Sequence, residues 1–182
     1  MNFNFKKTLI DNLIIVETTK FSDDRGYFLE NYKKPLFAEN GIKDDFVQDN
    51  RSYSKKNVVR GLHFQAGESQ QAKLVQCLSG EIYDVAVDLR KNSPTFGKHF
   101  GIILTPENGL MLYIPEGFAH GFSVLSDDAV LHYKVSSLYN PKSEFGLRWD
   151  DPTLAIDWKV ENPIVSTKDQ ELPLFKDLKV FA

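Results

Sequence analysis

The sequence predicts a mainly β protein, built as a sandwich or a barrel of antiparallel strands, and three observations support this fold class. Between residues 72 and 137, short runs of alternating apolar residues are separated by turn residues. Helical periodicity is weak throughout, with a short helix expected at 34–40 and one or two helical turns at 151–158. The 182 residues, 42% of them hydrophobic, can build one sizeable core but not two. A single domain is therefore expected over residues 1–182.

The predicted strands follow one another between clear turns, which stand at 79–80, 92–94, 106–109 and 126–128. In the run 72–90 the alternation assigns side chains to two faces. One face carries Tyr83, Val85, Val87 and Leu89, and the other carries Asp84, Ala86 and Asp88. After residue 140 the chain holds both tryptophans and four of the eight prolines. This part is expected to wrap the strands as an irregular segment.

Composition excludes several classes of function. Lys and Arg total 22 against 25 Asp and Glu, a formal charge of −3, and no basic block is present that would bind nucleic-acid phosphates. The single cysteine, Cys77, has no partner for an intramolecular disulfide, and the first residues lack the apolar run of a signal peptide. No run approaches the roughly 18 to 20 apolar residues that span a bilayer. These features predict a soluble cytoplasmic protein with neither a nucleic-acid nor a membrane partner.

A motif with the spacing G-x5-P-x-G-x2-H occupies residues 109–120 and ends at His120. Its glycines and proline would form a tight corner, after which a strand carries the histidine inward. The spacing resembles the second conserved motif of the cupins, whose fold is a double-stranded β-helix or jelly-roll barrel. In metal-binding cupins the first motif supplies two histidines and a glutamate, whereas residues 60–65 here read RGLHFQ, with one histidine and a glutamine. No catalytic metal is therefore expected.

Seven blocks in register resemble the dTDP-4-dehydrorhamnose 3,5-epimerases. They lie at 21–30, 47–65, 71–90, 93–97, 114–126, 149–158 and 166–170. The resemblance implies a cupin-like barrel that inverts carbons 3 and 5 of a 4-keto-6-deoxyhexose attached to dTDP, in the biosynthesis of dTDP-L-rhamnose for surface polysaccharide. It also implies that no other cofactor is needed and that the protein is a homodimer, for which a strand within 9–16 exchanged between subunits is a hypothesis.

The reaction requires a base on one face of the sugar ring, an acid on the other face, and a cationic or hydrogen-bonding group at the C4 oxygen. The resemblance assigns the base to His63, its carboxylate partner to Asp169, the acid to Tyr133 and the C4 contact to Lys73. Alternation supports two of these roles, because Tyr133 shares a face with Leu131 and Val135, and Lys73 shares one with Val75 and Cys77.

Each assignment has a structural alternative. Taken alone, His63 between two apolar neighbours is as often a core histidine, and Tyr133 as often a core tyrosine with a buried hydroxyl partner. A single lysine such as Lys73 is usually a surface residue. His120 faces inward and is expected to contact the sugar, with a purely structural role as the alternative. His132 is expected to be a solvated histidine on the opposite face from Tyr133.

The dTDP moiety needs contacts that no P-loop or Rossmann glycine pattern supplies here. Arg25 and Arg60 match the family positions that would hold the diphosphate, since a guanidinium binds phosphate oxygens in bidentate fashion. An aromatic side chain is expected to stack on thymine, with Tyr27, Phe28 and Tyr139 as alternatives. The remaining matching positions are Glu30, Gln48, Asp49, Asn50, Glu144 and Lys168. Cys77 and His99 receive no functional role, His99 as a solvated loop or edge position.

Three rival functions stay open from the sequence. A relative that inverts a single carbon, or accepts another nucleotide sugar, would share the catalytic residues, and two departures from the commoner family pattern, at Phe64 and at 136–138, keep it open. A non-catalytic cupin that binds nucleotide sugars would not need His63, Tyr133 and Lys73 together. A metal-dependent dioxygenase is disfavoured by the missing ligands.

Overall fold

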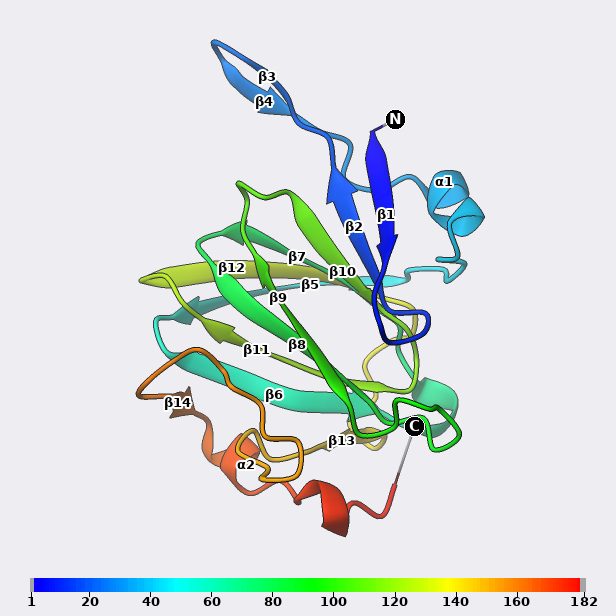
Figure 1. The fold of residues 1–182 in the computed structure, drawn as a ribbon, viewed down its shortest axis with the longest axis vertical. Helices are drawn as coiled ribbons and strands as arrows, with labels where there is room; N and C mark the ends of the chain where they lie inside the picture. Colours follow the sequence, from blue (N-terminus) through cyan, green and yellow to red (C-terminus); the bar gives the residue numbers. More distant parts are fainter. Residues whose placement is uncertain (1, 181–182) are drawn as a thin grey trace.

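The computed structural model describes residues 2–180, and it confirms the mainly β prediction: two β-sheets face each other, with only short helices outside them (Figure 1). The first sheet has the strand order β1 (Phe3–Lys7), β2 (Ile14–Thr18), β10 (Leu110–Ile114), β7 (Lys73–Ser79), β12 (Asp128–Val135) and β5 (Gln48–Lys55). The second has the order β13 (Glu144–Gly146), β6 (Val58–Gln65), β11 (Phe118–Val124), β8 (Ile82–Asp88) and β9 (His99–Leu104), with β14 (Ile164–Val165) parallel to β6.

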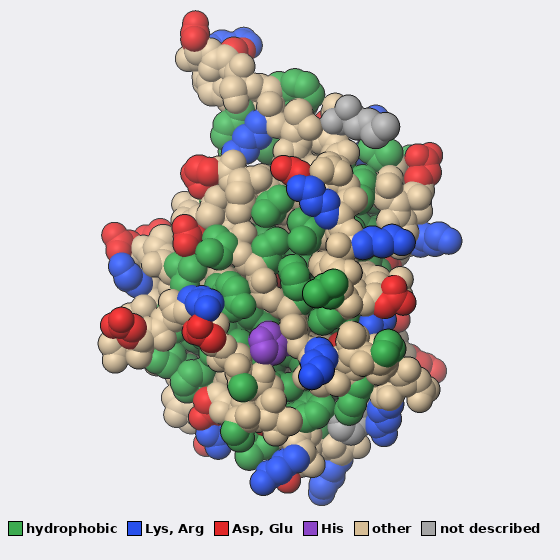
Figure 2. All heavy atoms as spheres, in the orientation of Figure 1, with side chains coloured by type: hydrophobic (Ala, Val, Ile, Leu, Met, Phe, Trp, Pro, Cys, Tyr) green, Lys and Arg blue, Asp and Glu red, His purple; other side chains and the backbone are tan. Residues whose placement is uncertain are grey.

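The remaining elements lie outside the two sheets. A hairpin of β3 (Phe21–Asp23) and β4 (Gly26–Phe28) projects from the body at the top of Figure 1. The helices are α1 (Lys34–Glu39), α2 (Thr167–Gln170) and two 3₁₀ turns at Gly67–Ser69 and Phe175–Asp177. Within residues 2–180 no helix is long and apolar enough to cross a membrane. Figure 2 shows hydrophobic side chains grouped near the middle of one face, with most charged side chains toward its edge.

The core between the sheets follows from the period-two alternation of the strands. Val75 and Leu131 from the first sheet meet Ala86 and Phe122 from the second, all buried in one cluster. Each strand that faces another sheet must present apolar side chains at every second position, and this is the pattern that the sequence carries. The same inward positions also bring a few polar side chains into the space between the sheets.

The outer face of each sheet is covered by a separate apolar cluster. Val85 and Val87 point outward from β8 and pack with Trp158 of the C-terminal segment, as the predicted two faces of this strand require. On the first sheet, Phe37 of α1 is fully buried against Phe3. The predicted wrapping by the tail and the predicted helix at 34–40 are thus confirmed.

The helix expected within 151–158 was wrong, because local hydrogen bonds favour turns there. One carboxylate oxygen of Asp151 accepts the backbone N–H groups of Thr153 and Leu154, at 2.8 and 2.9 Å, and Ala155 has a positive φ of 46°. Such side-chain contacts compete with helical hydrogen bonding. Instead, the short helix α2 forms after Ser166, whose hydroxyl caps it by accepting the N–H of Asp169.

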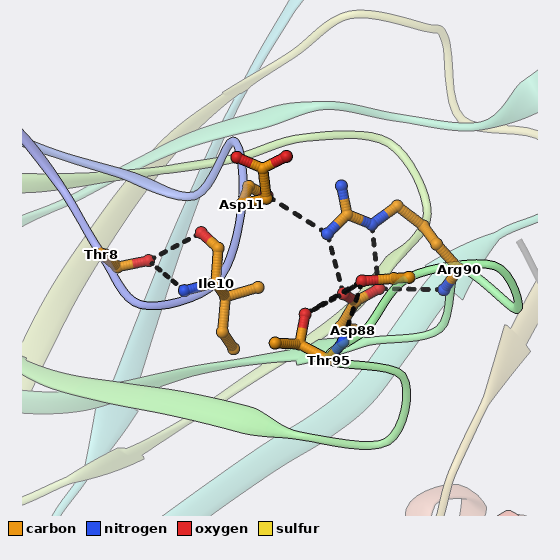
Figure 3. Close-up of polar contacts among 7 residues, drawn as sticks. Thr8, Ile10, Asp11, Asp88, Arg90 and Thr95 are labelled. Carbon is orange, nitrogen blue, oxygen red and sulfur yellow. Dashed lines mark hydrogen bonds and ion pairs between the residues drawn. The ribbon is translucent and has the colours of Figure 1, made fainter.

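A buried carboxylate fastens the turn after β8. Asp88 is fully buried and accepts hydrogen bonds from Arg90, Ser93 and Thr95 at 2.6 to 3.0 Å (Figure 3). The Arg90 guanidinium also donates to the carbonyl of Asp11, 3.1 Å away, and so joins this turn to the N-terminal loop. Burial opposes ionisation of Asp88, but the hydrogen bonds outweigh it and lower its pKa to about 2.

We expect Asp88→Asn to lower the free energy of unfolding at pH 7 by about 2–3 kcal/mol, because a neutral amide loses the charge-assisted hydrogen bonds. The folded pKa of about 2 lies below the unfolded value of 3.8. The stabilisation is therefore complete above the unfolded pKa and is lost as the pH falls toward 2. Urea unfolding at stepwise lower pH measures both effects. Asp127→Asn, at an exposed ion pair with Lys56, is the control and should change stability little. Equal stability of Asp88→Asn and wild type at pH 7 would contradict the expectation.

Candidate active site

A cavity of about 610 Å³ opens between the two sheets and is walled by strands from both of them. All four residues expected to be catalytic line it: His63, Lys73, Tyr133 and Asp169. Seven of the residues expected to bind substrate line it as well: Gln48, Asn50, Arg60, His120, Tyr139, Glu144 and Lys168. Strands that are far apart in the sequence therefore bring these side chains to one place.

His63 and Asp169 form a hydrogen-bonded pair at the wall of the cavity. The distance from His63 Nε2 to Asp169 Oδ1 is 2.8 Å, and the other carboxylate oxygen accepts the backbone N–H of Gly61 at 3.2 Å. Burial opposes ionisation of Asp169, but the hydrogen bond and charge of His63 and the contact with Gly61 hold its pKa below the ordinary value. An ionised carboxylate only accepts, so Nε2 carries the proton and the lone pair of the neutral ring is on Nδ1.

Lys73 begins β7 and extends its side chain into the cavity wall, where the residue is 8% exposed. Within residues 2–180 its ammonium has no hydrogen-bond or ion-pair partner. Burial lowers its pKa to about 8, and the carboxylates of Asp84 and Glu144 oppose that shift. The cavity thus holds a cation that is available to an anionic group of a ligand.

Tyr133 lies on β12 opposite Val75 of β7, and its ring is 6.5 Å from that of His120. Its side chain packs against the core between the sheets and lines the cavity, as its alternation with Leu131 predicted. Burial raises the pKa of Tyr133, with a smaller opposing effect from Arg60. The phenol is therefore protonated at neutral pH and can donate a proton.

The mouth of the cavity carries a polar cluster. Glu144 Oε2 accepts hydrogen bonds from Lys168 Nζ at 2.7 Å and from the Tyr139 hydroxyl at 2.9 Å. The backbone N–H of Tyr139 in turn donates to Gln48 Oε1 at 3.2 Å, and Gln48 donates to Asn50. These contacts join α2, the loop after β12 and strand β5 around the entrance.

Four residues expected at the site do not line the cavity of this chain. Arg25 and Phe28 lie on the β3–β4 hairpin, where Arg25 pairs with Asp23 at 2.5 Å and Phe28 is 67% exposed. Acidic and basic side chains are side by side at the hairpin tip (Figure 2). Glu30 accepts a hydrogen bond from Asn2, 2.7 Å away.

Asp49 is the fourth of these residues, and it forms a cluster with His132. Its carboxylate lies 2.8 Å from Lys134 Nζ and 3.5 Å from His132 Nε2. His132 was expected to be solvated, and this was wrong: its side chain is only 18% exposed, and its Nδ1 lies 2.9 Å from Gln76 Nε2. Polar neighbours on β5 and β7 cover the ring. His99, half-buried on the edge strand β9, lies away from the cavity.

One buried carboxylate at the site received no role from the sequence. Asp84 is fully buried, and its Oδ1 lies 2.8 Å from His120 Nε2. The alternation of β8 had placed Asp84 on the inner face with Ala86, and an acidic residue at such a position needs a polar partner. The sequence could therefore predict that Asp84 has a polar partner, but only the pairing of β8 with β11 in the structure shows that the partner is His120.

The two histidines of the cavity lie side by side on neighbouring strands of the second sheet, since His120 of β11 is paired with His63 of β6. The strands approach closely beside them, where a Cβ on Gly61 would lie 2.6 Å from Gly121 Cα. Only glycine fits there, and so the two imidazoles are held at one wall. Within residues 2–180 no group of three or more His, Cys, Asp or Glu side chains is arranged to hold a metal ion.

Comparison with known proteins gives one consistent result. The model of the dTDP-4-dehydrorhamnose 3,5-epimerase family matches residues 7–177. The chain is 48% identical to the dTDP-4-dehydrorhamnose 3,5-epimerase of Methanothermobacter thermautotrophicus, over 98% of each protein. It is 50% identical to the crystal structure of the same enzyme from Elizabethkingia anophelis, with a TM-score of 0.93 and coverage of 97% of this chain and 98% of that one.

A third similar structure contains a ligand. It is the dTDP-6-deoxy-D-glucose-3,5-epimerase of Legionella pneumophila in complex with dTDP-4-keto-L-rhamnose, at 46% identity. Its TM-score is 0.94, with 97% of this chain and 95% of that chain covered. These likenesses over nearly the whole length confirm the cupin-like jelly-roll fold.

We expect the Lys73 ammonium to titrate near pH 8, whereas an ordinary lysine has a pKa of 10.5. NMR of protein labelled at the lysine ε-carbon measures this, and Lys73→Met identifies the signal by its loss. Lys168 serves as the internal control, because its hydrogen bond to Glu144 raises its pKa and keeps it protonated. A Lys73 signal that titrates together with the exposed lysines would contradict the expectation.

Proposed function

The chain belongs to the dTDP-4-dehydrorhamnose 3,5-epimerase family and is a carbohydrate epimerase of this type, and from that premise we propose the role of each side chain. One observation carries the proposal: the His63–Asp169 pair lies in the same cavity as Lys73 and Tyr133. The substrate is dTDP-4-dehydro-6-deoxy-D-glucose, in which both inverted carbons are adjacent to a ketone. Their protons can be removed by a positioned base if the enolate oxygen is stabilised.

The two sheets supply the base and the acid from opposite walls. His63 comes from β6 of the second sheet, and Tyr133 comes from β12 of the first sheet. A sugar ring bound between them has one face toward the imidazole and the other toward the phenol. His63 removes the proton from one face, and Tyr133 delivers a proton to the other, so that the configuration of the carbon is inverted.

Lys73 and Asp169 stabilise the charges that develop. As the proton leaves carbon, negative charge moves to the C4 oxygen, and the ammonium of Lys73 stabilises it in a place where little water competes. His63 becomes an imidazolium, and the buried carboxylate of Asp169, 2.8 Å away, stabilises that cation and fixes the orientation of the ring. Charges of both signs therefore gain a partner in the transition state.

The polar mouth of the cavity suits the nucleotide. Arg60 and Lys168 provide cationic groups for the diphosphate, and Tyr139, which is 55% exposed, presents a ring for stacking on thymine. Glu144 holds Lys168 and Tyr139 in place through the contacts described above. The sugar would then reach inward to His120 and Lys73.

Arg25 and Phe28 are proposed to act across a homodimer. They lie on a hairpin that projects away from the body (Figure 1), and its rings Phe21, Tyr27 and Phe28 are all at least half exposed. An exposed aromatic hairpin is typical of a surface that meets a partner. If the hairpin reaches the cavity of a second copy, Arg25 adds a guanidinium to the diphosphate and Phe28 a ring to the base.

The cellular setting is proposed from the same premise. The chain, as one domain over residues 1–182, supplies an intermediate of dTDP-L-rhamnose biosynthesis for surface polysaccharide. Its only cysteine, Cys77, is buried and unpaired, which agrees with a reducing cytoplasm.

We expect the protein to incorporate deuterium at both C3 and C5 of dTDP-4-dehydro-6-deoxy-D-glucose in D₂O, as detected by NMR. His63→Ala should slow incorporation at both carbons by roughly 10² to 10⁴-fold, the usual contribution of a general base. His132→Ala is the matched control, because this histidine lies on the other face of β12, and it should retain the wild-type rate. Label at one carbon only would identify a single-carbon epimerase, and an active His63→Ala protein would refute the role of His63.

Shared active sites predict complementation between two inactive variants. Arg25→Ala and His63→Ala homodimers should each be inactive, whereas a heterodimer has one cavity with an intact His63 and an intact Arg25 from the partner. Random mixing after denaturation and refolding should therefore restore about a quarter of wild-type activity. Light scattering on the same samples measures the mass. A monomeric mass, or a mixture without activity, would contradict the proposal.

A further inference from the structure

Asp84 is a fully buried acidic residue that contacts a cavity residue, His120, and that has received no role so far. It lies on β8 of the second sheet, with its side chain directed inward, and it does not itself line the cavity. Oδ1 is 2.8 Å from His120 Nε2, and Oδ2 has no hydrogen-bond partner within residues 2–180. Burying a carboxylate in this state is costly, and a group retained at such a cost is a candidate for function.

The pairing of the strands explains the contact. His120 of β11 is paired with Ala86 of β8, and Asp84 lies two residues from Ala86 on the same face. The carboxylate therefore reaches His120 along the diagonal of an antiparallel pair. His120 lines the cavity and Asp84 does not, so Asp84 is connected to the cavity through its contact with His120.

The charges around Asp84 come from several elements. One of them is Lys73 of β7: the charge of the Asp84 carboxylate raises the pKa of this ammonium, against the larger effect of burial. Burial lowers the pKa of His120, Asp84 opposes that shift, and Lys73 and His63 add to it. Glu144 of β13 is the other carboxylate that acts on Lys73.

The geometry points to Asp84 as a positioning residue that orients the imidazole of His120 and keeps the ammonium of Lys73 charged for the C4 oxygen. An ionised carboxylate accepts the Nε2 proton of His120, and this leaves the lone pair of the neutral ring on Nδ1. The same carboxylate adds negative charge near Lys73, which has no ion-pair partner within residues 2–180. This inference rests on the role of Lys73 proposed above.

The experiment compares the pH profiles of kcat/KM for wild type and Asp84→Asn. Lys73 must be protonated to act, so kcat/KM falls at high pH as the Lys73 ammonium loses its proton. This fall is the basic limb of the profile. Removing the Asp84 charge should move that limb to lower pH by roughly one unit or more, the usual effect of a close opposite charge. Activity at neutral pH should fall roughly 10- to 100-fold, by analogy with the loss of carboxylates that orient metal-binding histidines. A basic limb that stays in place overturns the inference.

Asp88→Asn is the matched control, because Asp88 is also fully buried on the same face of the same strand, but its side chain bonds Arg90, Ser93 and Thr95, none of which line the cavity. It should leave the basic limb unchanged even if it destabilises the fold. Lys73→Met distinguishes failure of the proposed role of Lys73 from failure of the role of Asp84. If Lys73→Met retains activity, the proposed role of Lys73 fails, whereas a dead Lys73→Met with an unchanged Asp84→Asn profile refutes only the role of Asp84.

A measurement on the wild-type protein avoids any dependence on the folding of a variant. ¹⁵N NMR of the histidine side chains reports which ring nitrogen carries the proton. At neutral pH the His120 ring should carry its proton on Nε2, toward Asp84. A proton found on Nδ1 alone would overturn the proposed orientation.

Discussion

The desolvation of charged groups between two apolar sheets is the constraint on which the site depends. The space between the sheets is filled by side chains such as Val75 and Phe122, and ions placed there lose most of their hydration. Lys73 is held in this environment, and its pKa falls to about 8 as a result. A buried ammonium that has no ion-pair partner within residues 2–180 interacts strongly with any negative charge that forms beside it. In the proposed mechanism, that negative charge is the enolate oxygen, so the free-energy cost of burying Lys73 in the free protein is offset when the enolate forms.

The sandwich also provides the opposed geometry that an inversion needs. The side chains of a strand alternate between the two faces of its sheet. A single polar residue at an inward-facing position therefore places its side chain in the otherwise apolar space between the sheets. His63 and His120 lie side by side on the second sheet, and Tyr133 lies on the first sheet. A flat ring between two sheets has a different sheet on each face. The proposed base, His63, and the proposed acid, Tyr133, therefore belong to different sheets.

The period-two alternation of the sequence predicted on which face of a strand a side chain lies, but it could not predict which residue that side chain contacts. Alternation alone placed Tyr133 and Lys73 inward, as the cavity lining has them. The contact between His63 and Asp169 joins residues 106 apart, through a helix of four residues that carries no apolar periodicity. Local hydrogen bonds of Asp151 likewise replaced a predicted helix with turns. A pattern of apolar positions predicts neither contacts between residues far apart in the sequence nor local hydrogen bonds from side chains to the backbone.

Three buried aspartates show how the surroundings separate structural from functional carboxylates. Asp88 receives several hydrogen bonds from one turn, its pKa falls to about 2, and nothing in its environment is left to react. Asp169 divides its oxygens between the backbone and a histidine that faces the cavity. Asp84 has only a histidine, and one oxygen has no partner within residues 2–180. A carboxylate whose hydrogen bonds are all made within one turn holds that turn in place, whereas Asp169 and Asp84, each bonded to a histidine that lines the cavity, are proposed to act on the reaction through that histidine. Two aspartates on one strand therefore differ in role: Asp88 fastens a turn, and Asp84 is proposed to position His120.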